Sequence, residues 1–214
     1  MRILVIGATG TIGGAVADAL AARDATYEVL RASRRGGPPR VDLTDPASVD
    51  ALLRTAGPVD AIVCCAASGA LTPLTPLTAP PDADADADAD SRDGYWTGLD
   101  GKLIGQVDLV RRALAQVRDG GSLTLTSGHF AQPVAGSSLG HLVNAGLEAF
   151  VHAAALEMPR GVRLNVVSPG WVRETLAALG MDPAPGTPVA EVARVYVNAV
   201  EGTDHGRTLP VPAR

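Results

Sequence analysis

Short apolar runs alternate along the chain with segments that have the apolar spacing of helices. The runs predict strands at 2–6, 27–32, 41–43, 60–65, 122–126, 162–167 and 207–211. Helices are predicted at 15–23, 47–55, 101–118, 140–158 and 189–200. A repeated strand-then-helix order predicts an α/β fold, a Rossmann-type doubly wound parallel sheet in a single domain spanning residues 1–214. In such sheets ligands bind at the carboxyl ends of the strands.

Residues 68–98 interrupt this alternation with a low-complexity stretch. Its segment 82–90 alternates Asp and Ala and holds five carboxylates. We expect a solvated loop inserted on the ligand side of the sheet, because the repeat has no apolar pattern. A calcium site is the alternative, but it requires varied oxygen ligands around a glycine turn.

Composition and charge argue against several classes of protein. Hydrophobic residues make up 46% of the 214 residues, and the net charge is −5. No apolar run approaches the roughly 18 residues of a membrane helix, and the acidic balance argues against nucleic-acid binding. The first apolar run breaks at Gly7, too early for a signal peptide, and Cys64 and Cys65 are adjacent, which disfavours a disulfide. We therefore expect a cytoplasmic protein.

A glycine turn follows the first predicted strand. Gly7, Gly10 and Gly13 stand between that strand and a helix, which is the context of a dinucleotide-binding turn. The first glycine permits the tight turn, the second lets the backbone approach a pyrophosphate, and the third lets helix and strand pack closely. The free N–H groups at the helix N-terminus suit a phosphate.

The end of the second strand carries Ser33-Arg34-Arg35, with no acidic residue nearby. An Asp or Glu at this place usually binds the ribose hydroxyls of NAD, whereas guanidinium groups bind a 2′-phosphate. The sequence therefore predicts NADP(H) as the cofactor.

Together these motifs resemble the short-chain dehydrogenase/reductase family over nearly the whole chain. The matching segments are the turn 7–13, Ser33-Arg34, Asp42-Leu43, Ser127 and Asn-Val-Val-Ser-Pro-Gly at 165–170. Cys64-Cys65-Ala66-Ala67 stands where the family usually has Asn-Asn-Ala-Gly. The resemblance implies a small organic carbonyl or alcohol substrate, and a homodimer or homotetramer formed through helices 101–118 and 140–158.

The resemblance also implies further contacts with the cofactor. In the glycine turn, the expected contacts are Thr9, Thr11 and Ile12. The residues expected around the adenosine are Asp42, Leu43, Cys65, Ala66 and Ala67. The residues expected near the nicotinamide are Pro169, Gly170, Trp171 and Val172. Glu174 or Thr175 is expected to cover the amide end of the nicotinamide.

The catalytic positions depart from the family pattern. The family's proton donor is a Tyr followed four residues later by a Lys, and these positions hold Gly140 and Asn144. The family's helix Asn aligns with Lys102, the only Lys in a chain with 17 Arg. Gly140 cannot protonate an alkoxide, so ordinary ketoreduction by the family mechanism is doubtful. Ser127, Lys102 and Asn144 are the candidate catalytic residues. His141 is a further candidate because it neighbours the vacant Tyr position, and His129 because it follows a strand end.

Three functions remain open at this point. The first is an NADP(H)-binding oxidoreductase with a non-standard proton donor. The second is a non-redox enzyme on the same fold, an isomerase, cyclase or dehydratase, and the third is a non-catalytic nucleotide sensor. A Ser–His hydrolase lacks its Gly-x-Ser-x-Gly turn, and the four His show no metal-ligand spacing, so no metal is expected.

Overall fold

A computed structural model of the chain describes residues 1–37, 39–66, 71, 73–74, 96 and 98–212. Its centre is a parallel six-stranded sheet in the order β2-β1-β3-β4-β5-β6. The strands are β1 (Arg2–Ile6), β2 (Glu28–Ala32), β3 (Val59–Cys64), β4 (Val117–Thr126), β5 (Arg163–Ser168) and β6 (Thr208–Pro210). The strand order reverses direction at β1, which pairs with both β2 and β3. This reversal is the topological switch point at which such sheets bind ligands.

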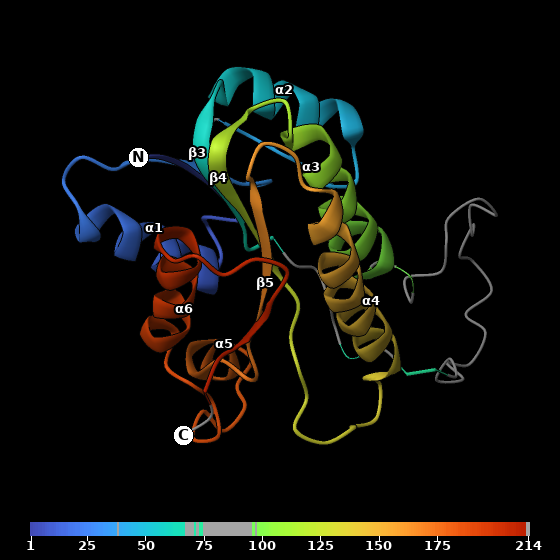
Figure 1. The fold of residues 1–214 in the computed structure, drawn as a ribbon. Helices are drawn as coiled ribbons and strands as arrows, with labels where there is room; N and C mark the ends of the chain where they lie inside the picture. The colour runs from blue at the N-terminus through green and yellow to red at the C-terminus, as the bar shows by residue number, and fades with distance from the viewer. Residues whose placement is uncertain (38, 67–70, 72, 75–95, 97, 213–214) are drawn as a thin grey trace, which may run out of the picture.

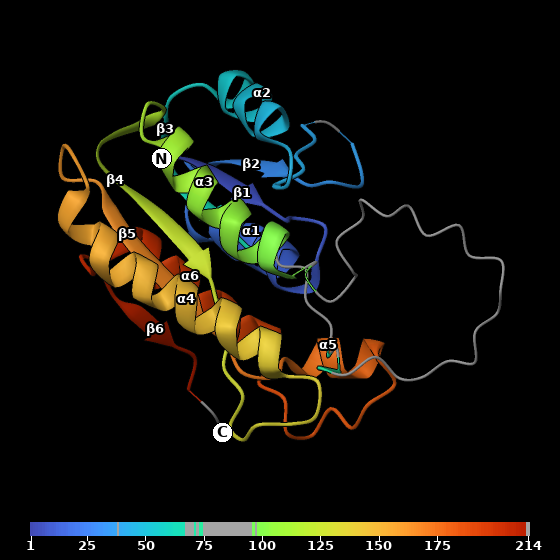
Figure 2. The same cartoon turned by 90° about the vertical axis from the view of Figure 1, so that its right-hand side faces the viewer.

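Helices cover both faces of the sheet (Figure 1). They are α1 (Thr11–Arg23), α2 (Pro46–Ala56), α3 (Gly105–Ala113), α4 (Ser138–Ala154), α5 (Arg173–Ala178) and α6 (Val189–Glu201), with a π-helical turn η2 (Leu99–Ile104) before α3 and a 3₁₀ turn η3 (Ala155–Glu157) after α4. One core cluster joins the sheet to α1 and α6, and another joins it to α2, α3 and α4. Figure 2 shows α3 and α4 side by side over the same face. The predicted Rossmann-type fold is therefore confirmed.

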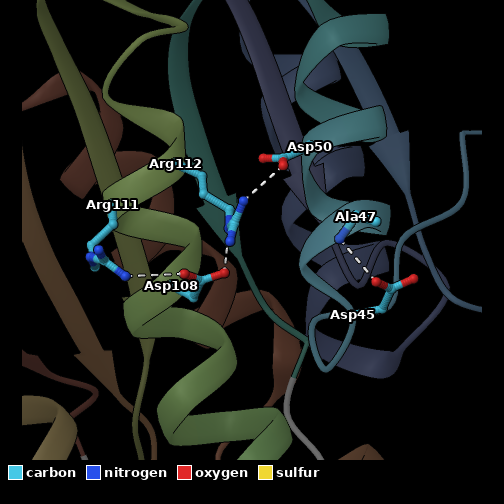
Figure 3. Close-up of polar contacts among 6 residues, drawn as sticks. All are labelled: Asp45, Ala47, Asp50, Asp108, Arg111 and Arg112. Atoms are coloured by element: carbon cyan, nitrogen blue, oxygen red, sulfur yellow. Dashed lines mark hydrogen bonds and ion pairs between the residues drawn. The ribbon is translucent and has the colours of Figure 1, made fainter.

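An ion-pair network ties α2 to α3 (Figure 3). Arg112 on α3 contacts Asp108 one turn earlier and reaches Asp50 on α2 at 2.7 Å. Asp45 caps α2 by accepting a 2.9 Å hydrogen bond from the Ala47 N–H. The ion pairs hold α2 against α3, and the cap fixes the start of α2.

Two predicted elements were wrong, and one short helix was missed. Residues 41–43 form no strand; that segment meets β2 only through an isolated bridge between Ser33 and Arg40. The helix predicted at 101–118 divides into η2 and α3 and ends at Ala113, because β4 begins at Val117. The short helix α5 was not predicted.

Glycine explains the early start of β4. At Gly121 a Cβ would lie 2.6 Å from the Asp60 carbonyl oxygen, so β3 and β4 approach too closely for a side chain. Their register shifts between Val59 and Ala61, which is an irregularity of the bulge type. Gly120 and Gly121, a pair that is also typical of a helix end, therefore lie inside a strand.

No helix among the described residues is long and apolar enough to cross a membrane. Most of the 68–98 stretch, including the Asp-Ala repeat, lies outside the described residues, so its solvated-loop assignment stays a prediction.

Candidate active site

A cavity of about 310 Å³ opens at the carboxyl ends of β1, β2 and β3; we call it the strand-end cavity. Its lining residues are Ile6, Gly7, Thr9, Gly10, Ser33, Arg34, Arg35, Val41, Asp42, Leu43, Thr44, Cys65, Ala66 and Gly101. These residues come from loops far apart in sequence, which the switch point brings together. Ten of the residues predicted to contact a cofactor line the cavity, whereas Ala67 lies outside the described residues.

The glycine turn forms one wall of the strand-end cavity. Gly7 has φ +86°, which disfavours a side chain, and its carbonyl accepts a 3.0 Å hydrogen bond from the Gly10 N–H. Gly10 caps α1 without any side-chain cap, so the first amides of α1 remain open to a ligand. Gly13 lies beneath the turn rather than in the cavity: a Cβ there would stand 2.1 Å from the Gly7 carbonyl oxygen.

Thr11 and Ile12 do not line the strand-end cavity. They form the first positions of α1, where Thr11 is exposed and Ile12 packs against the core cluster of α1 and α6. Any contact of these two residues with a cofactor involves their backbone amides at the helix N-terminus or lies outside this cavity.

The opposite wall carries positive charge. Arg34 and Arg35 are exposed at the cavity rim, and within the described ranges neither guanidinium forms an ion pair. The Ser33 hydroxyl donates a 2.6 Å hydrogen bond to the Arg35 carbonyl, which shapes the turn that presents both side chains. Asp42 accepts hydrogen bonds from the Thr44 N–H and hydroxyl; these bonds, and to a lesser degree Arg34, lower the Asp42 pKa.

A second group of polar side chains gathers at Ser127, directly after β4. Ser127 is buried, and its hydroxyl donates a 2.7 Å hydrogen bond to Oε1 of Glu148 on α4. Lys102 on η2 donates a 2.7 Å hydrogen bond from Nζ to the Ser127 carbonyl oxygen. Burial lowers the Lys102 pKa to about 8, while the Glu148 carboxylate acts in the opposite direction. The structure thus brings together Ser127 and Lys102, as predicted.

Glu148 was missed by the sequence reasoning. It follows Gly140 by eight residues and Asn144 by four, so the three lie on one stripe of α4. That spacing is the signal that could have pointed to it.

Gln106 positions Lys102. Its side-chain nitrogen donates to the carbonyl oxygens of Lys102 and Thr126, and its side-chain oxygen accepts from the Thr126 N–H at 2.9 Å. The π-helical turn closes with a hydrogen bond from the Gly105 N–H to the Asp100 carbonyl. Such turns are rare and are found frequently at functional sites. Here the turn and Gln106 together fasten Lys102 to the end of β4.

Phe130 packs against Gly140, the position predicted to correspond to the family's Tyr. Its ring lies 3.2 Å from where a Cβ of Gly140 would stand. The same ring contacts His141 at 5.0 Å and the edge of Trp171 at 5.8 Å between centroids. Beside this aromatic cluster, the buried Asn144 has no hydrogen-bond partner for Oδ1 among the described residues, so that atom is open to a ligand or water.

The remaining predicted residues follow β4 and β5. His129 is exposed, and its Nδ1 lies 3.1 Å from the Ser168 carbonyl oxygen, which orients the ring beside Gly170. Val172 is buried in the core cluster of α1 and α6, and its backbone bridges to Thr187. Glu174 accepts a 2.8 Å hydrogen bond from the Val189 N–H at the start of α6, which gives it a structural role.

Residues 169–172 and Thr175 do not line the strand-end cavity. The predicted nicotinamide-side contacts therefore remain separate from the cavity that holds the glycine turn and the two arginines. Thr175 is half-buried on α5, and Pro169 is buried after β5.

Tyr196 on α6 hydrogen-bonds Thr126, the residue that precedes Ser127. Thr126 donates its hydroxyl proton to the Cys64 carbonyl at 2.6 Å, so the fully buried Tyr196 hydroxyl donates to Thr126 at 2.8 Å. We expect Tyr196→Phe to lower the free energy of unfolding by about 1 kcal/mol, the net value of one hydrogen bond. Urea unfolding measures this change, with Tyr27→Phe, whose hydroxyl is exposed, as the control. Equal stability of both variants and the parent would contradict the assignment.

Comparisons with known proteins agree with this arrangement. Residues 7–194 match the family model described as enoyl-(acyl carrier protein) reductase. The solved structure of the protein lin1944 from Listeria innocua is 33% identical, with 99% of this chain and 100% of that chain covered and a TM-score of 0.84. A small-chain dehydrogenase is 25% identical over 99% of this chain and 96% of the other, with a TM-score of 0.75.

A small-chain dehydrogenase solved in complex with NADPH is 24% identical, with the same coverage of 99% and 96% and a TM-score of 0.77. No match was found among curated proteins. With its parallel sheet, its glycine turn at the switch point and a family model matched over most of its length, the chain belongs to the short-chain dehydrogenase/reductase family.

Proposed function

We propose that this protein is an NADP(H)-dependent oxidoreductase that acts on a small organic carbonyl or alcohol. The observation that carries the proposal is the strand-end cavity, where a glycine turn with open helix amides faces two arginines that form no ion pair with the described part of the chain. The amides and the α1 dipole suit a pyrophosphate, and the guanidiniums suit a 2′-phosphate.

The residues present fit the adenosine half of the cofactor. Val41 and Leu43 supply apolar surface for an adenine ring, and Cys65 and Ala66 close the other side. Asp42, kept ionised by Thr44, adds a hydrogen-bond acceptor at the edge. A bound NADP(H) would supply hydride transfer to or from the substrate carbon. Ser127 and Lys102 would orient the substrate oxygen and stabilise charge on it, with Asn144 beside them.

A non-redox function is the second candidate. It is favoured by Gly140, which provides no proton-donating side chain, and by Phe130, which packs against it. An isomerase, cyclase or dehydratase would use the same polar groups for proton transfer while the nucleotide stays unchanged. Product formation without a change in nicotinamide absorbance would select this function, and nucleotide binding without any turnover would favour a sensor.

We further propose a homo-oligomer formed through η2, α3 and α4. Ile104 and Leu142 are exposed on these elements, and an interface would bury them. The adjacent free thiols Cys64 and Cys65 favour a reducing, cytoplasmic location, which stays a prediction.

Arg34→Ala tests the cofactor choice. Loss of a phosphate–guanidinium contact should weaken NADPH binding by about 10- to 100-fold, equivalent to about 1.5–3 kcal/mol for a hydrogen bond to a charged group. NADH, which has no 2′-phosphate, should bind the parent and the variant equally. Nicotinamide fluorescence measures both dissociation constants. Arg54→Ala, an exposed cation outside the strand-end cavity, is the matched control. Equal affinity of the parent for NADPH and NADH would refute the proposal.

A further inference from the structure

Three elements of the fold bring polar groups to Ser127. The Ser127 hydroxyl hydrogen-bonds Glu148 on α4 at 2.7 Å, and the Ser127 carbonyl accepts from Lys102 on η2 at 2.7 Å. A second, longer contact of the hydroxyl, 3.4 Å to the Val167 carbonyl, is too long to compete. The side chains come from positions 21 and 25 residues away in the chain, so packing alone creates the arrangement.

The direction of the Ser127 hydrogen bond sets what the hydroxyl can do. An ionised carboxylate only accepts hydrogen bonds, so the single Ser127 proton is directed at Glu148. The lone pairs of Oγ are then the part of the hydroxyl left for a substrate O–H. A serine bonded in this way accepts a proton from one side and releases its own to the other.

We propose that Glu148 exchanges the proton of the reaction through Ser127, and so performs the task of the Tyr that this chain lacks at Gly140. The proposal rests on the oxidoreductase function argued above. Glu148 touches no substrate itself; Ser127 makes that contact.

The step balances in atoms and electrons. In the oxidation direction the alcohol O–H bond breaks and its proton passes to Ser127 Oγ, while the Ser127 proton passes to Glu148. The carbon loses a hydride, with its two electrons, to the oxidised nicotinamide of the proposed function. The products are a carbonyl, the reduced nicotinamide and a protonated Glu148, which returns its proton to solvent. Carbonyl reduction is the reverse sequence.

Lys102 supplies the charge that such a relay needs. Its ammonium is held against the Ser127 carbonyl, and Glu148 is the charged residue whose field acts on it. The titratable groups on the elements packed here are Lys102 and Asp100 on η2, with His129 after β4. On α4 they are His141, Glu148 and His152, the last one exposed. The ammonium and the carboxylate therefore lie on two sides of Ser127, one at its carbonyl oxygen and the other at its hydroxyl.

Lys102 is the only lysine in the sequence, which allows a direct test on the protein without nucleotide or substrate. Biosynthetic labelling with [ε-¹³C]lysine gives one resonance, whose shift with pH reports the Lys102 pKa. The expected value in the parent lies well below that of a free lysine, because the side chain is buried. Glu148→Gln should lower it further, by about 1 unit, since an opposite charge nearby is lost. Glu148→Asp should restore part of the difference.

The matched control is Glu157→Gln, which removes an exposed carboxylate from η3 just beyond α4. It should leave the Lys102 titration unchanged. A Lys102 pKa that is the same in the parent and in Glu148→Gln would overturn the proposal, because the two groups would then not be coupled. This result does not depend on whether NADPH binds.

The kinetic test uses alcohols and carbonyls that the parent converts. Glu148→Gln should reduce kcat by about 100-fold, the lower end of general acid–base contributions, while the NADPH dissociation constant stays within about twofold. The parent should lose alcohol oxidation at low pH as a carboxylate is protonated, and Glu148→Gln should lack that limb. Glu148→Asp should recover part of the rate, and its activity should still fall at low pH.

A Glu148→Gln variant that keeps the kcat and pH profile of the parent would refute the relay and leave the oxidoreductase proposal standing. If the parent converts nothing although it binds NADPH, the oxidoreductase proposal fails, and the relay as written fails with it.

Discussion

Lys102→Met is expected to reduce turnover of the protein's substrate by about 10²- to 10⁴-fold, the usual contribution of a group engaged in acid–base chemistry. Methionine keeps the length and apolar body of the side chain but removes the ammonium that donates to the Ser127 carbonyl. The strand-end cavity holds Gly101 but not Lys102, so NADPH affinity should change by less than about threefold. Steady-state kinetics and fluorescence titration separate the two effects.

Arg111→Met is the control for loss of a cation. Arg111 is exposed on α3 and pairs only loosely with Asp108, at 3.5 Å. It should retain full turnover. Lys102→Arg distinguishes charge from proton transfer: arginine keeps the positive charge, but it does not release a proton. Unchanged turnover in Lys102→Met would remove Lys102 from the active site.

The pH dependence of this effect follows from burial. The Lys102 pKa is lowered from 10.5 to about 8, so the ammonium is present below pH 8 and is lost above it. An activity that needs the ammonium should therefore fall as the pH rises through about 8. Below the folded pKa the buried charge opposes folding, and stability gains from its deprotonation as the pH rises from about 8 toward 10.5.

The second large effect is expected at the glycine turn. Gly13→Ala places a Cβ 2.1 Å from the Gly7 carbonyl oxygen and 2.6 Å from the carbonyl carbon. Both are backbone atoms, so the turn itself has to move. We expect the free energy of unfolding to fall by about 1–3 kcal/mol or more, as for other overpacked sites, and dinucleotide binding to be lost because the turn is displaced. Denaturant unfolding and fluorescence titration measure these changes.

Gly37→Ala is the matched glycine control. A Cβ at Gly37 has no atom within 4 Å among the described residues, and no positive φ is required there. Stability and binding should be those of the parent. A Gly13→Ala variant with parent-like stability and affinity would show that α1 and the turn are not packed as described.

The sequence by itself determined the sheet and the glycine turn. β1 was predictable because a strand buried on both faces must be apolar throughout, and Ile3 to Ile6 are fully buried. The turn was predictable because few other residues tolerate the positive φ of Gly7 or the close packing at Gly13. Ser127 was predictable as well, since polar residues that follow buried strands meet at one edge of a parallel sheet.

The prediction from sequence was wrong where the same residues fit two kinds of local structure. The run 41–43 is too short to distinguish a strand from a buried loop, and in the structure the Val41 N–H bonds the Ser33 carbonyl instead of extending a ladder. Gly120 and Gly121 suit a helix stop and a bulged strand equally well, and the close approach of Asp60 on β3 decides between them.

Only the tertiary structure decided which groups surround Ser127. Glu148 shows nothing in the sequence beyond its place on one face of a helix, and its contact with Ser127 exists because α4 packs across the end of β4. The position of Lys102 depends on a π-helical turn and on Gln106, neither of which has a periodic signature. Phe130 lies against Gly140 because the loop after β4 folds back onto α4. Contacts across such distances in sequence follow from how whole elements pack, which no local pattern of residues specifies.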